Sequence, residues 1–270
     1  MSALIVLAAL CGWFVLQLVV LGGMQQTRAQ YELYGELRQR LVAQTASLGG
    51  AIEPGAPVAL LSVPTLGLQQ VVVEGTASGD LLAGPGHRRD TVLPGQVGVS
   101  IVYGRASTYG APFRAVPSLQ PGDGIQLTTA QGEFVYRVDG VRRAGDPLPA
   151  PLTSGGGRLT LVTAEGDGPL AALAPSRTVY VDATLQGTAV VGAPGRPAAI
   201  PDSERAMAGD PSVLPALALT LQGLLVAAVG AIVLRRHLPG RVLWVIAAPV
   251  LVALAWLAGG VAVQLLPNLL

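Results

Sequence analysis

Three long runs of apolar residues stand apart from the rest of the chain. They cover roughly Leu4 to Gly23, Val213 to Leu234 and Val242 to Leu266. A helix needs about 20 mostly apolar residues to cross the hydrocarbon core of a bilayer, so each run is long enough to span one. We therefore predict transmembrane helices over residues 1–23, 212–234 and 242–266.

The first apolar run is open to two interpretations, a cleaved signal peptide or an uncleaved anchor. A signal peptide has a basic n-region before its apolar segment and a small-residue cleavage site after it. Residues 1–23 contain no Lys or Arg, and the run continues into a polar helical pattern without an obvious small-x-small site. This pattern favours the uncleaved anchor.

The orientation in the membrane follows from the short connection between the second and third apolar runs. Residues 235–241 read RRHLPGR. Because basic residues in short loops are retained on the cytoplasmic side, we predict that this loop is cytoplasmic. The segment from Met24 to Ser212 and the C-terminus are then extracytoplasmic, the N-terminus is cytoplasmic, and the protein is a multi-pass protein of a bacterial plasma membrane.

A polar helical pattern fills residues 24–56, between the first apolar run and the next segment. Tyr34, Leu37, Leu41 and Leu48 recur at coiled-coil spacing among glutamines and charged residues. We predict an extracytoplasmic helical stalk. Two heptads leave two interpretations open: the helix packs on its own domain, which the pattern favours, or it forms an oligomer seam.

The pattern changes over residues 57–187 to short alternating or β-branched runs separated by Gly, Pro and Asp, such as EFVYRVDGV and TVYVDATL. Short strands with turn signals at close spacing predict an all-β barrel or sandwich, and about 130 residues suffice for one core. Residues 188–211 are rich in Ala, Pro and Gly without a usable period. They predict a semi-extended tether back to the membrane.

Composition removes several classes of function. The net charge is +1, and all 17 basic residues are Arg, so nothing in the charge favours nucleic-acid binding. Cys11 is the only cysteine, which excludes an intramolecular disulfide, a thiolate metal cluster and a cysteine nucleophile in the outer domain. Glu165 and Asp167 alone are too few oxygen ligands for calcium. We predict no metal and no cofactor.

Several stretches of the β region resemble the sortases, cysteine transpeptidases that attach proteins to bacterial cell walls, and most of all the class E type of actinobacteria. The matching stretches occur in the family's order and cover essentially all of 57–187: VEG, LLAGPGHRRDTVLPGQVG, TYGAPFRAVPSLQPGDGIQL, YRV, RLTLVT and SRTVYVDATL. The combination of GPGH with YGAPF and PGD is specific, whereas each piece alone is weak. The resemblance implies a closed eight-stranded β-barrel, here with three transmembrane helices.

The resemblance also implies three catalytic positions: a cysteine nucleophile after LTLVT, a histidine, and an arginine on the following strand. Ala164 occupies the cysteine position and Arg105 the histidine position, while Arg177 retains the arginine. Acyl transfer needs a thiolate and a group that exchanges protons near neutral pH. Alanine supplies no lone pair, and arginine stays protonated. The three positions are therefore predicted to be vestigial.

Two origins of Ala164 are open: natural loss of catalysis, or an engineered Cys-to-Ala change made to trap substrates. The engineered origin does not by itself explain Arg105, so the sequence favours a native pseudoenzyme. Another enzymatic interpretation is a sortase-fold transpeptidase or hydrolase with an unrecognised nucleophile. Its candidates are Thr163, which strand alternation should turn away from the pocket, Ser107 and Thr108 in the turn after Arg105, and His87. Within the family, the histidine of GPGH is not the catalytic one.

The remaining function is binding. We predict that Arg105 and Arg177 bring two positive charges to the vacated site, where they can hold a carboxylate, a phosphate or a carbonyl group. The predicted peptide- or partner-binding residues are Arg105, Arg177, His87, Tyr109 and Thr163. The alternative, left open, is that Arg105 pairs with a nearby acid and the groove is vestigial.

The membrane segments add predicted partners besides the lipid bilayer. Gln17 and Gln222 lie within apolar spans and should find partners, because lone amides are costly in lipid. The helices can therefore pack within the chain or dock to another membrane protein. We predict a pseudo-sortase that serves as a structural, regulatory or binding subunit of a cell-envelope membrane assembly, with a sorting-signal-like peptide or an envelope protein at the barrel groove.

Overall fold

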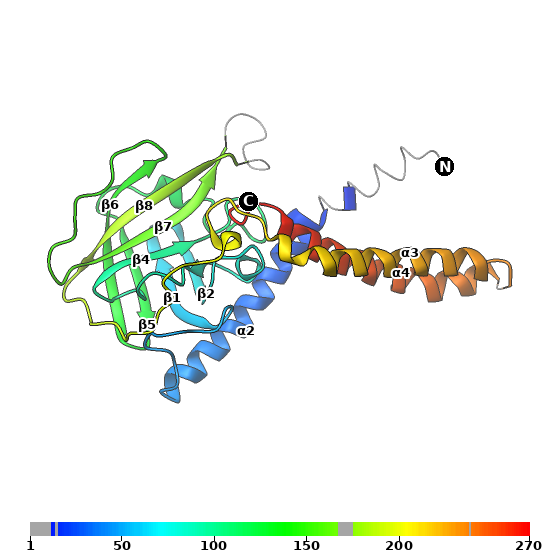
Figure 1. The fold of residues 1–270 in the computed structure, drawn as a ribbon, viewed down its shortest axis with the longest axis horizontal. Coiled ribbons are helices and arrows are strands. Elements are labelled where there is room, and N and C mark those ends of the chain that lie inside the picture. Colours follow the sequence, from blue (N-terminus) through cyan, green and yellow to red (C-terminus); the bar gives the residue numbers. More distant parts are fainter. Residues whose placement is uncertain (1–11, 14–15, 167–174, 238) are drawn as a thin grey trace.

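The computed structural model describes residues 12–13, 16–166, 175–237 and 239–270. Its main body is a β-barrel, and a long pair of apolar helices projects from one end of that barrel (Figure 1). A polar helix of similar length lies along the barrel wall. The predicted combination of a β domain with apolar helices is thus present in one molecule.

Eight strands close into the barrel in the order β1-β2-β3-β4-β7-β8-β6-β5, which confirms the predicted fold of the β region. Most neighbouring strands are antiparallel, but β2 pairs parallel with β3, and β4 pairs parallel with β7. The strands are β1 (Pro57–Val63), β2 (Leu68–Glu74), β3 (Gly86–His87), β4 (Gly98–Tyr103), β5 (Gly124–Thr129), β6 (Gly132–Arg143), β7 (Gly157–Glu165) and β8 (Arg177–Gln186).

Alternation along the strands fills the barrel interior. Successive side chains of a strand point to opposite faces, so every second residue enters the core. On β7, Leu159 and Leu161 are fully buried in the main core cluster, together with residues such as Phe113 and Tyr136. The last outward-facing residues of β7, Val162 and Ala164, are buried as well. Another part of the chain therefore covers the outer face of the barrel at this end of β7.

Helix α2 (Gly22–Val42) packs on its own barrel. The side chain of Gln30 accepts a hydrogen bond from the backbone N–H of Val71 and donates to the Val71 and Ala83 carbonyls. Leu37 is buried, whereas Tyr34 is exposed. Of the two interpretations of this segment, the structure shows the helix that packs on its own domain.

The connection over residues 188–211 follows the barrel surface on its way to the apolar helices. Val190 pairs with Gln96, and Ala193 with Gly49, in isolated β-bridges. Further along, the buried carboxylate of Glu204 forms an ion pair with Arg89. These contacts fix the connection although it carries almost no regular secondary structure.

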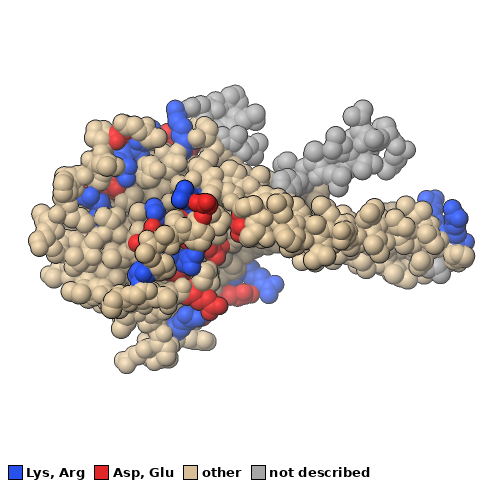
Figure 2. Space-filling model, viewed as in Figure 1, with Lys and Arg blue, Asp and Glu red and all other residues tan. Residues whose placement is uncertain are grey.

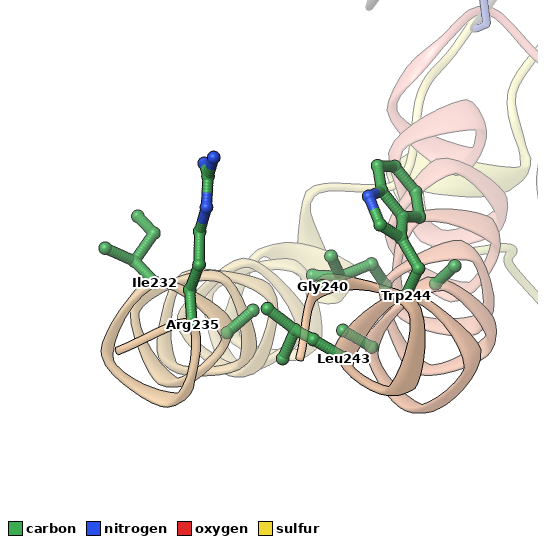
Figure 3. A pocket seen from close by; sticks show the side chains of 9 residues that line it. Ile232, Arg235, Gly240, Leu243 and Trp244 are labelled. Carbon is green, nitrogen blue, oxygen red and sulfur yellow. The ribbon is translucent and has the colours of Figure 1, made fainter. Parts of the chain in front are cut away.

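Two described helices are long and apolar enough to cross a membrane, α3 (Leu214–Leu234) and α4 (Gly240–Ala262). They form the projecting hairpin, whose surface carries charge only at its far tip, where the RRHLPGR loop lies (Figure 2). A hollow of about 310 Å³ opens between the helices near that tip, with Arg235 and Trp244 on its rim (Figure 3). Arginine and tryptophan at the end of an apolar helix are typical of a membrane–water interface.

Most of the expected first span lies outside the described residues. Its last part, the π-helical turn Gln17–Leu21, runs directly into α2. Gln17 is fully buried, and its side-chain amide donates a hydrogen bond to the Trp256 carbonyl in α4, at 3.0 Å. Gly259 makes room, because a Cβ there would lie 1.9 Å from the Gln17 amide oxygen. The prediction that Gln17 finds a partner is confirmed, whereas Gln222 is exposed on α3.

Candidate functional site

The strand pairing brings positions 105, 164 and 177 to one end of the barrel. β4 and β7 run parallel with Tyr103 opposite Val162, and the Gly104 N–H donates to the Val162 carbonyl at 2.9 Å. This hydrogen bond extends the register past the end of β4, so Arg105 follows at the level of Ala164. β7 and β8 run antiparallel, with Ala164 opposite Thr178.

Ala164 lies in a small buried apolar cluster on the outer face of the barrel. Its side chain is only 3% exposed. The buried members of this cluster are Leu81, Tyr103, Ala106, Val162, Ala164 and Leu269. Among the described residues, the surroundings of Ala164 are therefore apolar and almost closed to solvent.

Arg105 is also buried, with no exposed surface. Its Nη2 donates to the Ser78 carbonyl at 2.9 Å and to the Ser78 hydroxyl at 2.8 Å, and its Nη1 donates to the Thr108 hydroxyl at 3.1 Å. All three of these acceptors are neutral oxygens. The guanidinium therefore joins two loops of the chain as a structural cation.

The environment of Arg105 disfavours its charge but does not remove it. Burial lowers the pKa of Arg105 to about 10, so the group stays protonated at neutral pH and cannot act as the proton carrier of an acyl transfer. Tyr109, whose ring centroid lies 5.5 Å from the guanidinium carbon, favours the cation through its π face. Burial in turn raises the pKa of the Tyr109 phenol.

Arg177 has a different environment from Arg105. Its side chain is about half exposed and lies 3.6 Å from the Glu165 carboxylate, which also accepts a hydrogen bond from Arg143 at 2.6 Å. Arg177 is thus exposed at the paired ends of β7 and β8, whereas Arg105 is buried in its loop contacts. The pairing of Arg105 with a nearby acid is not what the described contacts show.

His87 and Thr163, two further predicted binding residues, are fully buried in hydrogen bonds within the barrel. The Thr163 hydroxyl donates to the Gly104 carbonyl at 3.0 Å. The His87 ring lies between the Glu74 carboxylate, 2.9 Å from Nδ1, and the Val92 carbonyl, 2.8 Å from Nε2. Tyr109 is buried too, so Arg177 is the one predicted binding residue that has an exposed side chain.

The Thr91 hydroxyl lies 3.2 Å from Nε2 of His87, so Thr91, His87 and Glu74 have the spacing of a nucleophile, a base and an orienting acid. The hydrogen bonds contradict that role. A carbonyl can only accept, so Nε2 must donate its hydrogen to Val92 and cannot take a proton from Thr91. The Thr91 hydroxyl itself donates to the Arg88 carbonyl at 2.7 Å. These contacts order a loop and do not activate a nucleophile.

An open hollow of about 320 Å³ continues along the outer face of β4, β7 and β8, next to the buried cluster. Tyr103 and Val162 belong to both. The hollow is lined by Arg88, Arg142, Arg158, Tyr180 and Asp182, and by Leu148 and Pro149 of the β6–β7 loop. We call the buried cluster with Arg105 the closed end of the groove, and this hollow the open end.

The closed end contains residues that the sequence did not single out, namely Ser78, Leu81 and Leu269. Each is far from position 164 in the chain, and each has an ordinary sequence context. Arg158 and Tyr180 at the open end lie within strands whose pattern was read as structural. Among the described residues, no group of three or more His, Cys, Asp or Glu side chains is arranged to hold a metal ion. Asp167 lies outside the described residues.

Comparison with known proteins identifies the family. The family model described as Sortase domain matches residues 61–184. Sortase D of Bacillus subtilis is 33% identical over 86 residues, which cover 32% of this chain and 42% of the relative. Sortase SrtE1 of Streptomyces coelicolor is 32% identical over 131 residues, which cover 42% of this chain and 37% of the relative. The matches thus span about two fifths of each curated relative.

Among solved structures, sortase E from Streptomyces avermitilis is 32% identical, with a TM-score of 0.41. The match covers 57% of this chain and all of that chain. The chain belongs to the sortase family.

Proposed function

We propose that this chain is a membrane-anchored pseudo-sortase: it has the barrel of a cell-wall transpeptidase but does not catalyse acyl transfer. It acts as a structural, regulatory or binding subunit of a cell-envelope membrane assembly. A peptide resembling a sorting signal, or an envelope protein, is its partner outside, and membrane proteins are partners of its apolar helices.

One observation carries this proposal. The positions that supply the nucleophile and the histidine in the family hold Ala164 and Arg105, and both side chains are buried. A methyl group cannot form a thioester, and a guanidinium bound to neutral oxygens has no base to offer. Two of the alternative candidates, His87 and Thr163, do not replace them, because both side chains are engaged in hydrogen bonds within the fold.

The membrane part of the proposal rests on the exposed apolar hairpin and its basic tip. Large apolar residues such as Leu219, Val226 and Trp244 are exposed along α3 and α4, as expected of surfaces that face lipid or another helix. With the RRHLPGR loop in the cytoplasm, the barrel is extracytoplasmic. The expected first span completes a three-span, multi-pass topology in the plasma membrane.

The catalytic half of the proposal is tested with the full chain in mild detergent. A fluorogenic sorting-signal peptide is supplied with an amine acceptor, and cleavage and acyl transfer are followed by mass spectrometry. We expect no turnover from the parent chain. Turnover that is abolished by Ser107→Ala, Thr163→Val or His87→Ala would show an enzyme with an unrecognised nucleophile and overturn the proposal.

The partner half is tested in native membranes by photo-crosslinking followed by mass spectrometry. Amine-directed reagents are unsuitable because the chain contains no Lys. We expect specific partners to be recovered with the parent chain. If the chain purifies without partners and also fails to bind sorting-signal peptides, the role as a binding subunit is wrong.

A further inference from the structure

The chain returns to the barrel after α4. The helix ends at Ala262, a short 3₁₀ turn covers Val263–Leu265, and residues 266–270 then run against the closed end of the groove. Figure 1 shows this red end of the chain lying on the barrel at the base of the hairpin. Leu269 is fully buried there, although a membrane hairpin by itself would not require a buried segment beyond its last turn.

The side chain of Leu269 belongs to the same buried cluster as Ala164, Val162 and Tyr103. Those three residues lie on the outward faces of β4 and β7, where alternation alone would expose them. Leu269 and its neighbours therefore explain why the end of β7 is buried on both faces. Position 164 and Leu269 thus share one buried cluster on the outer face of the barrel.

The loop that contains the former histidine position holds the backbone of this segment. The Ala106 N–H donates to the Leu269 carbonyl at 2.9 Å, and both the N–H and the hydroxyl of Thr108 donate to the backbone oxygen of Leu270, at 3.3 and 2.6 Å. The same Thr108 hydroxyl accepts a hydrogen bond from Arg105. Arg105 thus orders the loop that receives the segment.

The opposite side of the segment is fixed as well. The fully buried Asn268 side chain donates to the carbonyls of Thr76 and Arg205, at 2.8 and 2.9 Å. The backbone N–H of Asn268 donates to the Ala208 carbonyl at 2.8 Å. The Ser78 hydroxyl donates to the Leu266 carbonyl at 3.3 Å. A buried amide that meets two carbonyls in this way indicates a built receptor, because such a group is costly unless it is bonded.

We propose that residues 266–270 are a built-in ligand of the closed end, and that a peptide reaches the position of Ala164 only after this segment has been released. Because the segment is continuous with α4, release couples the barrel to the membrane hairpin. A partner that binds the hairpin can thereby open or close the groove. The proposal does not depend on the proposed loss of catalysis, since the segment would cover a reactive residue at this position as well.

The test measures access to position 164 in the full chain, in detergent, with Cys11→Ala as background. Ala164→Cys then places the only thiol in the buried cluster that contains Leu269. Position 105 holds no histidine, so this variant does not become an enzyme. We expect a small charged thiol reagent to modify it at least ~10-fold more slowly than the thiol of Val191→Cys, a position that is 81% exposed.

Truncating the Leu269 side chain should make position 164 more accessible. Leu269→Ala is expected to raise the modification rate of the Ala164→Cys thiol by at least ~10-fold, because removal of a buried leucine side chain weakens docking by more than the equivalent of one power of ten. The matched control is Leu257→Ala, which removes the same atoms from an exposed position on α4 and should change the rate less than about 2-fold. Asn268→Ala keeps Leu269 but removes the two side-chain hydrogen bonds to the Thr76 and Arg205 carbonyls, and it should also raise the modification rate.

Circular dichroism of each variant verifies that the barrel is folded. If Leu269→Ala loses the barrel signal, Asn268→Ala decides the question by the same comparison. The proposal is overturned if the Ala164→Cys thiol reacts as fast as that of Val191→Cys, or if a folded Leu269→Ala or Asn268→Ala chain reacts no faster than the Leu257→Ala control. These rates report access and not turnover, so an active enzyme would contradict the proposed function without affecting this result.

Discussion

The closed and open ends of the groove are built on the same three strands, yet they differ in what covers them. At the closed end, Ala164 shares a buried cluster with Leu269, Arg105 is bound to Ser78 and Thr108, and both residues have almost no exposed surface. At the open end, Arg142 packs over the Tyr180 ring at 4.3 Å and pairs with Asp182 at 2.5 Å, beside an unfilled hollow. Two stretches of one sheet face therefore differ in their exposure to solvent.

The difference teaches that, under the proposed function, a site without its catalytic groups need not be a vacant one. At positions 164 and 105, this chain has a methyl group in an apolar cluster with Leu269 and a buried cation bound to neutral oxygens. The open end of the groove lies nearer the start of β7. It is lined by arginine and tyrosine side chains and by the β6–β7 loop. A partner that binds in the groove without displacing residues 266–270 would contact the open end.

Substituting one arginine at each end tests the comparison most strongly. Arg105→Ala removes three buried hydrogen bonds and leaves a cavity, so we expect the free energy of unfolding to fall by about 3 kcal/mol. Arg158→Ala removes one hydrogen bond to the Ala150 carbonyl at an exposed position and should cost under about 1 kcal/mol. Thermal unfolding in detergent, followed by far-ultraviolet circular dichroism, measures both.

Arg105→Met separates packing from charge in the same experiment, because it retains most of the aliphatic volume. We expect its stability to lie between those of the parent and Arg105→Ala. Equal stabilities for Arg105→Ala and Arg158→Ala would contradict the assignment of Arg105 as the cation that holds the closed end together.

The closed end should also respond to pH through Asp80, which lies two residues after Ser78 and next to Leu81. Burial raises the pKa of Asp80 to about 6. Between about pH 4 and pH 6 the folded chain then holds a proton that the unfolded chain has released, so the free energy of unfolding falls as the pH rises through this window. We expect a change of about 2 kcal/mol, and a flatter profile for Asp80→Asn. Denaturant unfolding at a series of pH values gives the slope, and an unchanged slope in Asp80→Asn would assign the dependence to other groups.

The smallest effect is expected where the end of β7 meets β8 at the surface. Glu165 binds Arg143 and lies near Arg177, and the hydrogen bond from Arg143 lowers the pKa of the Glu165 carboxyl. A lowered pKa means that this contribution is present near neutral pH and is lost as the pH falls through the folded-state value. Glu165→Gln should cost under about 1 kcal/mol, and less in high salt. A larger, salt-independent loss would show that this ion pair belongs to the buried frame of the closed end.

Much of the fold could be predicted from local patterns in the sequence. Period-two runs such as RLTLVT and TVYVDATL specify strands, and the long apolar runs of α3 and α4 specify spanning helices, because both signals depend on neighbours along the chain. The path of the linker over residues 188–211 could not be predicted for the same reason. Its composition carries no period, and only contacts such as the Glu204–Arg89 ion pair fix it on the barrel.

The candidate site divides in the same way. The sequence by itself determined that positions 164 and 105 carry no nucleophile and no proton carrier, because those are properties of the side chains. Only the tertiary structure decided that Arg105 is buried against Ser78. It also decided that Leu269, which is far from Ala164 in the sequence, joins Ala164 in one buried cluster. Burial and hydrogen bonding depend on which distant segments meet, and barrel closure and the return of the chain from α4 bring them together.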